Sequence, residues 1–141
     1  MFDDRYTFGT RVDAPIGDVR ETVIAALKTE GFGVLTEIDM AATLRAKLGV
    51  ERDPYLILGA CNPPFAHQAV THDPSIGALL PCNIVIRVDD TGVVVEVMDP
   101  RAVLALVGDP GVDEIAAEVR ARLVRAVEAV QAQFTVTESA Q

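Results

Sequence analysis

Hydrophobic residues in the first half of the chain recur at two different spacings, and each spacing indicates an element. Residues 6–12 alternate with a period of two, which is typical of a strand with one buried face. Apolar residues after Pro15 recur three and four positions apart up to Gly31, which indicates an amphipathic helix. The elements predicted after this helix are a strand over residues 32–38, a short helix over 40–48, a buried strand over 55–60 and a further short helix over 63–70.

The second half of the chain carries the clearest patterns. Residues 82–89 and 92–98 are rich in β-branched side chains, and the two residues between them predict a β-hairpin. An apolar stripe from about Asp109 to Gln133 predicts the longest helix, with a length of about 36 Å. Together, the hairpin and two long helices predict an α+β fold in which both main helices pack on one face of a mostly antiparallel sheet.

Composition and net charge limit the number of domains and the classes of binding partner that we expect. Half of the 141 residues are hydrophobic, so we expect one domain over residues 1–141, with a core over about 5–133 and a frayed tail over 134–141. A formal net charge of −9 repels phosphate backbones and anionic lipids, so neither nucleic acid nor membrane is an expected partner. A charged amino terminus and the lack of an apolar run near 20 residues favour a cytoplasmic location. Symmetric homo-oligomers are common, which makes a homodimer the expected assembly.

Two Cys-Asn pairs are the most unusual local feature. Cys61-Asn62 falls at a predicted strand end, and Cys82-Asn83 falls at a predicted strand start. If the two strands are neighbours, the thiols meet, and Cys61 lies beside the amino end of the following helix, where Asn62 is the expected N-cap. His67 lies about one helical turn past Asn62. These five residues form the candidate site for a small ligand.

Three interpretations of this site stay open. In the first, Cys61, His67 and Cys82 bind a small ligand or a thiophilic metal such as zinc. In the second, Cys61 is the nucleophile of a thiol-dependent enzyme or redox protein, and His67 or Arg87 supplies the cation that stabilises its thiolate. In the third, both cysteines are core residues of a homo-oligomeric structural or interaction module, because free cysteine is commonly buried. Whether the protein is an enzyme therefore stays undecided at this point.

Several short motifs occur in an order that resembles a known family. Among them are Gly31-Phe32-Gly33-Val34, Leu58-Gly59-Ala60-Cys61-Asn62-Pro63, Leu79-Leu80-Pro81-Cys82-Asn83 and Met98-Asp99-Pro100. Over about residues 5–133 the chain resembles the domain of unknown function 302 family. That resemblance implies a TBP-like α+β fold with the order strand, helix, four strands and closing helix, and it implies no activity. It also places Cys61, Asn62 and Cys82 within family motifs.

Overall fold

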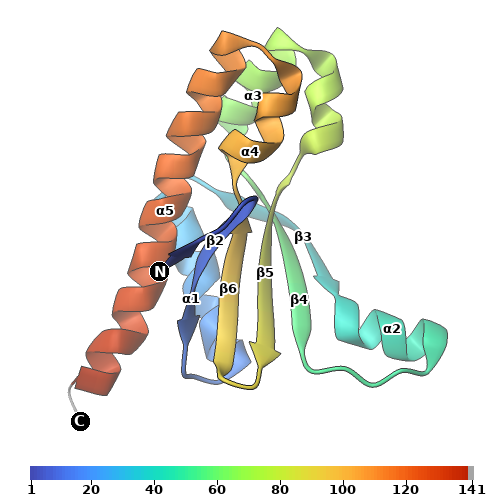
Figure 1. Cartoon of the computed structure of the whole chain (residues 1–141), viewed down its shortest axis with the longest axis vertical. Helices are drawn as coiled ribbons and strands as arrows, with labels where there is room; N and C mark the ends of the chain where they lie inside the picture. The colour runs from blue at the N-terminus through green and yellow to red at the C-terminus, as the bar shows by residue number, and fades with distance from the viewer. Residues whose placement is uncertain (140–141) are drawn as a thin grey trace.

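A six-stranded sheet forms the centre of the molecule (Figure 1). The computed structural model describes residues 1–139, with side chains as far as Thr135. All neighbouring strands in this part of the chain are antiparallel, in the spatial order β1-β2-β6-β5-β4-β3. The strands are β1 (Phe2–Asp3), β2 (Thr7–Val12), β3 (Gly33–Asp39), β4 (Tyr55–Cys61), β5 (Cys82–Asp89) and β6 (Gly92–Met98). The predicted antiparallel sheet is confirmed, and β1 is a short strand that the sequence pattern does not predict.

Two long helices, α1 (Ile16–Thr29) and α5 (Pro110–Ser139), pack on one face of the sheet, as the sequence predicts. Their apolar stripes meet alternate residues of β2, β4, β5 and β6 in the main hydrophobic core. Helix α5 continues past its predicted end at Gln133. The frayed tail expected over 134–141 stays a prediction, because residues 140–141 and the side chains of 136–139 lie outside the described part of the structure.

A group of short helices covers one end of the sheet, at the top of Figure 1. We call this group the helical cap. It consists of α3 (Pro63–His72), the 3₁₀ helix η1 (Pro74–Leu79), α4 (Pro100–Leu104) and the 3₁₀ helix η2 (Ala105–Val107), packed on the first turns of α5. A second, smaller core holds the cap together, and it contains Ala69, Ile76, Leu104, Val112 and Ala116. The sequence pattern predicts α3 but does not predict η1, α4 or η2.

Helix α2 (Met40–Leu48) projects from the β3 edge of the sheet (Figure 1). The Asp39 side chain caps its amino end by accepting a hydrogen bond from the Ala42 N–H at 2.9 Å. Gly49, with φ of 68°, ends the helix in a left-handed conformation that glycine adopts without strain. None of the residues of α2 is buried, so local capping supports this helix more than core packing does.

A charged cluster joins the cap to the opposite edge of the sheet. Arg120 of α5 donates to the Asp99 carboxylate at 3.1 Å and to Asp3 at 2.7 Å, and its guanidinium lies 4.8 Å from the centre of the Phe8 ring. Asp99 also accepts from the Arg101 N–H at 2.9 Å, which caps α4. This cluster fixes the position of α4, and therefore of one wall of the site described next.

Candidate functional site

The two cysteines lie at the points where the chain leaves and re-enters the sheet. Strand β4 ends at Cys61, and β5 begins at Cys82. The two strands are hydrogen-bonded neighbours, with Ala60 directly opposite Cys82. Residues 62–81 therefore form an excursion that builds α3 and η1 and returns to its starting point. Because the two strands are neighbours, this register brings the two Cys-Asn motifs next to each other.

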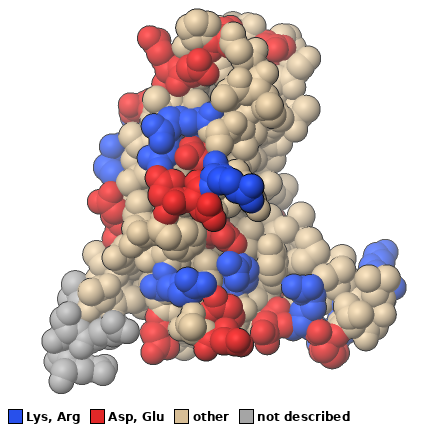
Figure 2. Space-filling view, in the orientation of Figure 1, with Lys and Arg blue, Asp and Glu red and all other residues tan. Residues whose placement is uncertain are grey.

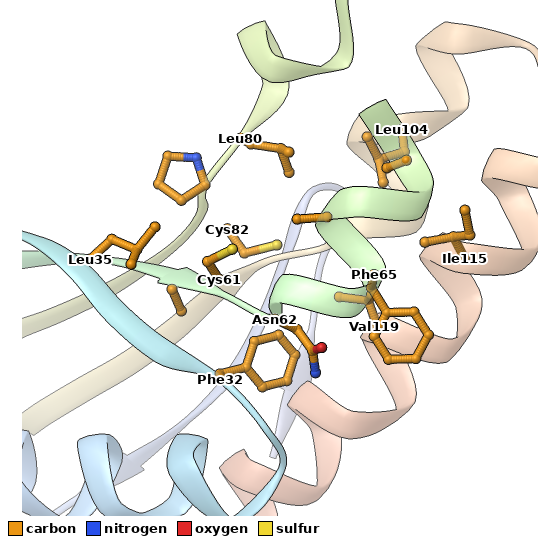
Figure 3. A pocket seen from close by; sticks show the side chains of 14 residues that line it. Phe32, Leu35, Cys61, Asn62, Phe65, Leu80, Cys82, Leu104, Ile115 and Val119 are labelled. Atoms are coloured by element: carbon orange, nitrogen blue, oxygen red, sulfur yellow. The ribbon is translucent and has the colours of Figure 1, made fainter. Parts of the chain in front are cut away.

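A pocket of about 300 Å³ lies where the helical cap meets the sheet (Figure 3). It separates the main core from the smaller core of the cap, and residues of both cores line it. Among the described residues, the polar lining groups are the two thiols and the Asn62 amide. The complete lining is Phe32, Leu35, Ala60, Cys61, Asn62, Phe65, Ala66, Ala69, Leu80, Pro81, Cys82, Leu104, Ile115 and Val119.

The two thiols differ in their surroundings although both face this pocket. Figure 3 shows their sulfur atoms next to each other, and neither forms a disulfide. Cys82 is buried, with 7% of its surface exposed, whereas Cys61 is partly exposed. Burial, with a smaller contribution from the neighbouring Cys61, raises the pKa of Cys82 to about 11. Cys82 is therefore a neutral thiol at physiological pH.

Asn62 connects the base of the cap to the end of α1. Its side-chain Nδ2 donates to the Glu30 carbonyl at 3.3 Å. Gly31 has φ of +87°, and a Cβ atom at this position would approach the Asn62 Nδ2 to 3.1 Å. Asn62 does occupy the N-cap position of α3, but its side chain makes no capping hydrogen bond. The predicted N-cap position of Asn62 is therefore confirmed, and its side-chain amide bonds to the Glu30 carbonyl and not to the amino end of α3.

Gly59 and Pro81 pack against each other behind the pocket. A Cβ atom on Gly59 would lie 2.7 Å from the Pro81 Cγ and would also overlap the Thr36 hydroxyl. The Leu80–Pro81 peptide is cis. Gly59, close before Cys61, thus leaves the space that Pro81, directly before Cys82, occupies. This contact fixes how the two ends of residues 62–81 meet.

Arg122 is a nearby cation that the sequence pattern does not predict. Its guanidinium lies 5.2 Å from the centre of the Phe65 ring, and it donates to the Glu30 carbonyl at 3.4 Å and to Glu118 at 3.2 Å. Arg122 therefore holds the Phe65 wall of the pocket from α5. No sequence spacing relates residue 65 to residue 122, so only the fold could reveal this contact.

Three other predicted residues lie elsewhere. His67 and Asn83 are exposed, and neither lines the pocket. Arg87 lies further along β5 and donates to Glu96 at 2.8 Å. Among the side chains that the structure describes, residues 1–135, no three His, Cys, Asp or Glu residues are grouped so that they could hold a metal ion. The structure therefore brings Cys61, Asn62 and Cys82 together at one pocket but does not assemble the predicted metal set, because His67 lies on the solvent side of α3.

Basic and acidic side chains are interspersed over the face of the molecule shown in Figure 2. Several of them form ion pairs, such as Arg11 with Asp89 at 2.8 Å and Arg20 with Glu37 at 2.6 Å. Within the described residues, no helix combines the length and the apolar character needed to cross a bilayer.

These features define a class: an α+β domain in which a helical cap and an antiparallel sheet enclose an apolar pocket with two thiols. A family model for Domain of unknown function DUF302 matches residues 8–130, and the chain belongs to this family. The crystal structure of an uncharacterized conserved protein DUF302 from Bacillus stearothermophilus is similar, with 27% sequence identity and a TM-score of 0.83 over 89% of this chain and 98% of that chain. No curated protein matches the sequence. The family resemblance inferred from the motifs is confirmed.

Proposed function

We propose that this domain binds a small, neutral, mainly apolar molecule in the pocket beneath the helical cap. The observation that carries the proposal is a cavity of about 300 Å³ whose walls are almost wholly hydrocarbon. An apolar cavity of about 150 Å³ is sufficient to bind benzene, so this pocket has room for about twelve carbon atoms. Its volume is at the lower end of the range for small-molecule sites.

The packing around the pocket supports a binding function. Protein interiors are closely packed, and spaces larger than a water molecule are rare in them. Here the pocket lies between the two hydrophobic cores, and it is framed by the Gly59–Pro81 contact and by the Arg122–Phe65 contact. A cavity held open by such contacts is suited to a ligand that fills it.

The electrostatics of the pocket favour a neutral ligand. Burial raises the pKa of Cys82 to about 11, which means that the surroundings penalise a negative charge at this position. The nearby cation, Arg122, lies against Phe65 and is already engaged with Glu30 and Glu118. A carboxylate or phosphate inside the pocket would therefore be desolvated without a free partner.

The test is a titration with ethylbenzene, followed by NMR of ¹³C-labelled methyl groups. We expect saturable shifts at Leu80, Leu104 and Val119, and no shifts with benzoate as the charged analogue. Ala66→Phe places a ring inside the pocket and should abolish or strongly weaken these shifts. Gln68→Phe adds the same ring on the exposed side of α3 and serves as the matched control. Unsaturable shifts, or shifts confined to residues outside the pocket, would contradict the proposal.

The free edge of the sheet supports a second candidate, a homodimeric interaction module. Strand β3 is the terminal strand, and apolar side chains are concentrated on β3, α2 and the following loop. Leu35, Ile38, Leu48 and Val50 are 68%, 45%, 69% and 42% exposed. An open strand edge pairs readily with its own copy, and a second β3 would bury these residues symmetrically.

Native mass spectrometry at several protein concentrations tests this assembly. We expect a dimer for the unmodified chain and a monomer for Ile38→Lys, which places a charge on the edge strand. Leu106→Lys is the matched control, because Leu106 is 79% exposed in the helical cap and lies outside the proposed interface. A monomer for the unmodified chain at every concentration would exclude the dimer.

A further inference from the structure

We propose that Cys61 and Cys82 form a redox-active dithiol that closes into an intramolecular disulfide at the base of the helical cap, with low-molecular-weight disulfides as its oxidising substrates. This activity goes beyond the binding of an apolar ligand and does not depend on it. The observations that carry it are the strand register, the shared pocket and the different accessibility of the two thiols.

The register places the two Cα atoms at a separation that a disulfide bond can span. Ala60 lies opposite Cys82, so Cys61, the last residue of β4, is one residue further along. Because successive side chains of a regular strand point to opposite faces, the direction of the two thiols follows from the pocket that both line and not from the register. Neighbouring strands are about 4.8 Å apart and successive residues about 3.3 Å apart, which puts the two Cα atoms at a separation of about 6 Å. Disulfides join Cα atoms separated by roughly 4.4–6.8 Å. Both side chains point into the same pocket with their sulfur atoms adjacent (Figure 3).

The two thiols have different parts in the reaction. Cys61 is partly exposed at the pocket, whereas Cys82 is buried beside it. The Cys61 thiolate attacks one sulfur of the substrate disulfide RSSR, which forms the mixed disulfide Cys61–S–S–R and releases RS⁻, which takes up a proton. Cys82 then gives its proton to a solvent base and attacks the Cys61 sulfur, and the second RS⁻ leaves. The two protein thiols are oxidised to one disulfide, and RSSR is reduced to two RSH.

The apolar pocket favours the two end states over the charged intermediate forms. A dithiol and a disulfide are both neutral, whereas a thiolate at Cys82 is desolvated. Ring closure therefore depends on the small fraction of Cys82 that is deprotonated, because the thiolate is the attacking species. Below a pH of about 11, this fraction rises about tenfold for each pH unit.

Closure of the disulfide has a structural consequence for the cap. Residues 62–81 connect the two cysteines and contain all of α3 and η1. A bond between Cys61 and Cys82 joins the two ends of this segment, so it restricts local opening of the cap away from the sheet. Amide hydrogen exchange in residues 62–81 should be slower in the oxidised protein, and exchange in the β5–β6 hairpin should be unchanged.

The experiment treats the reduced, folded protein at pH 8 with bis(2-hydroxyethyl) disulfide under anaerobic conditions. Samples are quenched with acid, free thiols are alkylated with maleimide in denaturant, and the intact mass is measured. We expect a product that has lost the mass of two hydrogen atoms, carries no maleimide and regains its mass with dithiothreitol. The rate of closure should rise about tenfold between pH 7 and pH 8, once formation of the mixed disulfide is made fast by excess reagent.

Single variants separate the two steps. Cys82→Ser should stop at a stable mixed disulfide on Cys61, and Cys61→Ser should react with the reagent at least tenfold more slowly. Two outcomes with the unmodified chain would overturn the proposal. One is a protein that carries a mixed disulfide on each cysteine, and the other is a folded protein that stays fully reduced while the urea-unfolded protein is oxidised. Because neither result involves ethylbenzene, a failure here is distinct from a failure of ligand binding.

Discussion

The sharpest prediction from the pocket concerns a homologous series of alkylbenzenes. Each additional methylene group buried in a hydrocarbon environment contributes about 0.8 kcal/mol, which corresponds to about a fourfold lower Kd. By scaling from benzene in about 150 Å³, a pocket of about 300 Å³ is filled by about twelve carbon atoms. We therefore expect Kd to fall about fourfold per carbon from toluene to hexylbenzene and then to stop falling.

The assay is the methyl-group NMR titration applied to each member of the series at 25 °C. Ala66→Phe adds a six-carbon ring to the pocket wall and leaves room for about six carbon atoms, so its affinity should already fail to improve from toluene onward. Gln68→Phe adds the same ring to the exposed side of α3 and should reproduce the unmodified series. The position of the plateau therefore measures the volume of the pocket, while the slope measures its polarity.

Two results would refute this reasoning. A slope below about twofold per carbon would show that the alkyl chain is not transferred into a hydrocarbon environment. An affinity that keeps rising well beyond twelve carbons, with equal slopes in both variants, would show that the chains bind an open surface and not the pocket.

Three further predictions concern stability and pH. Arg120→Leu leaves the buried Asp99 carboxylate without its cation, so urea unfolding should show a loss of about 3 kcal/mol. Gly59→Ala forces a methyl group against Pro81 and should lower the free energy of unfolding by about 1–3 kcal/mol in the same assay. The raised pKa of Cys82 means that the unfolded chain releases this proton first as pH rises, so stability should fall between about pH 9 and pH 11. This fall amounts to at most about 3 kcal/mol, and urea unfolding of Cys82→Ala at each pH should lack it.

Elements with a strong local period could be predicted from the sequence. The β5–β6 hairpin, helix α1 and the long helix α5 each bury one regular face. Their apolar residues therefore recur in the sequence with the period of a strand or of a helix. The short helices η1 and α4 could not be predicted in the same way. Each is held by tertiary contacts in the small core of the cap, such as Ile76 of η1 and Leu104 of α4. Elements of five or six residues are too short to show a helical period of their own.

The candidate site was predictable only where its residues lie close to strand ends. Cys61 and Cys82 follow from the strand assignments and the register, whereas Leu104, Ile115 and Val119 come from segments that only folding brings together. The helical spacing of α3 was sufficient to predict that His67 lies outside the site. Phe65, Ala66 and Ala69 form the apolar face of α3, and His67 lies about 100° to 160° away from these residues around the helix.

The motifs around the two cysteines contain some residues whose packing explains the residue type and others whose type needs a further reason. Gly59, Pro81 and Asn62 each make a contact that explains the residue type, because a different side chain would overlap a neighbour or lose a hydrogen bond. The sulfur atoms of Cys61 and Cys82 instead line a cavity, where a side chain gains fewer dispersion contacts than it would in a filled core. Burial in the main core is consistent with a thiol at Cys82, whereas Cys61 is partly exposed at the pocket and packing alone does not explain its residue type. What explains Cys61 better is the chemistry of its sulfur atom, because two adjacent thiols at the ends of residues 62–81 can bond to each other.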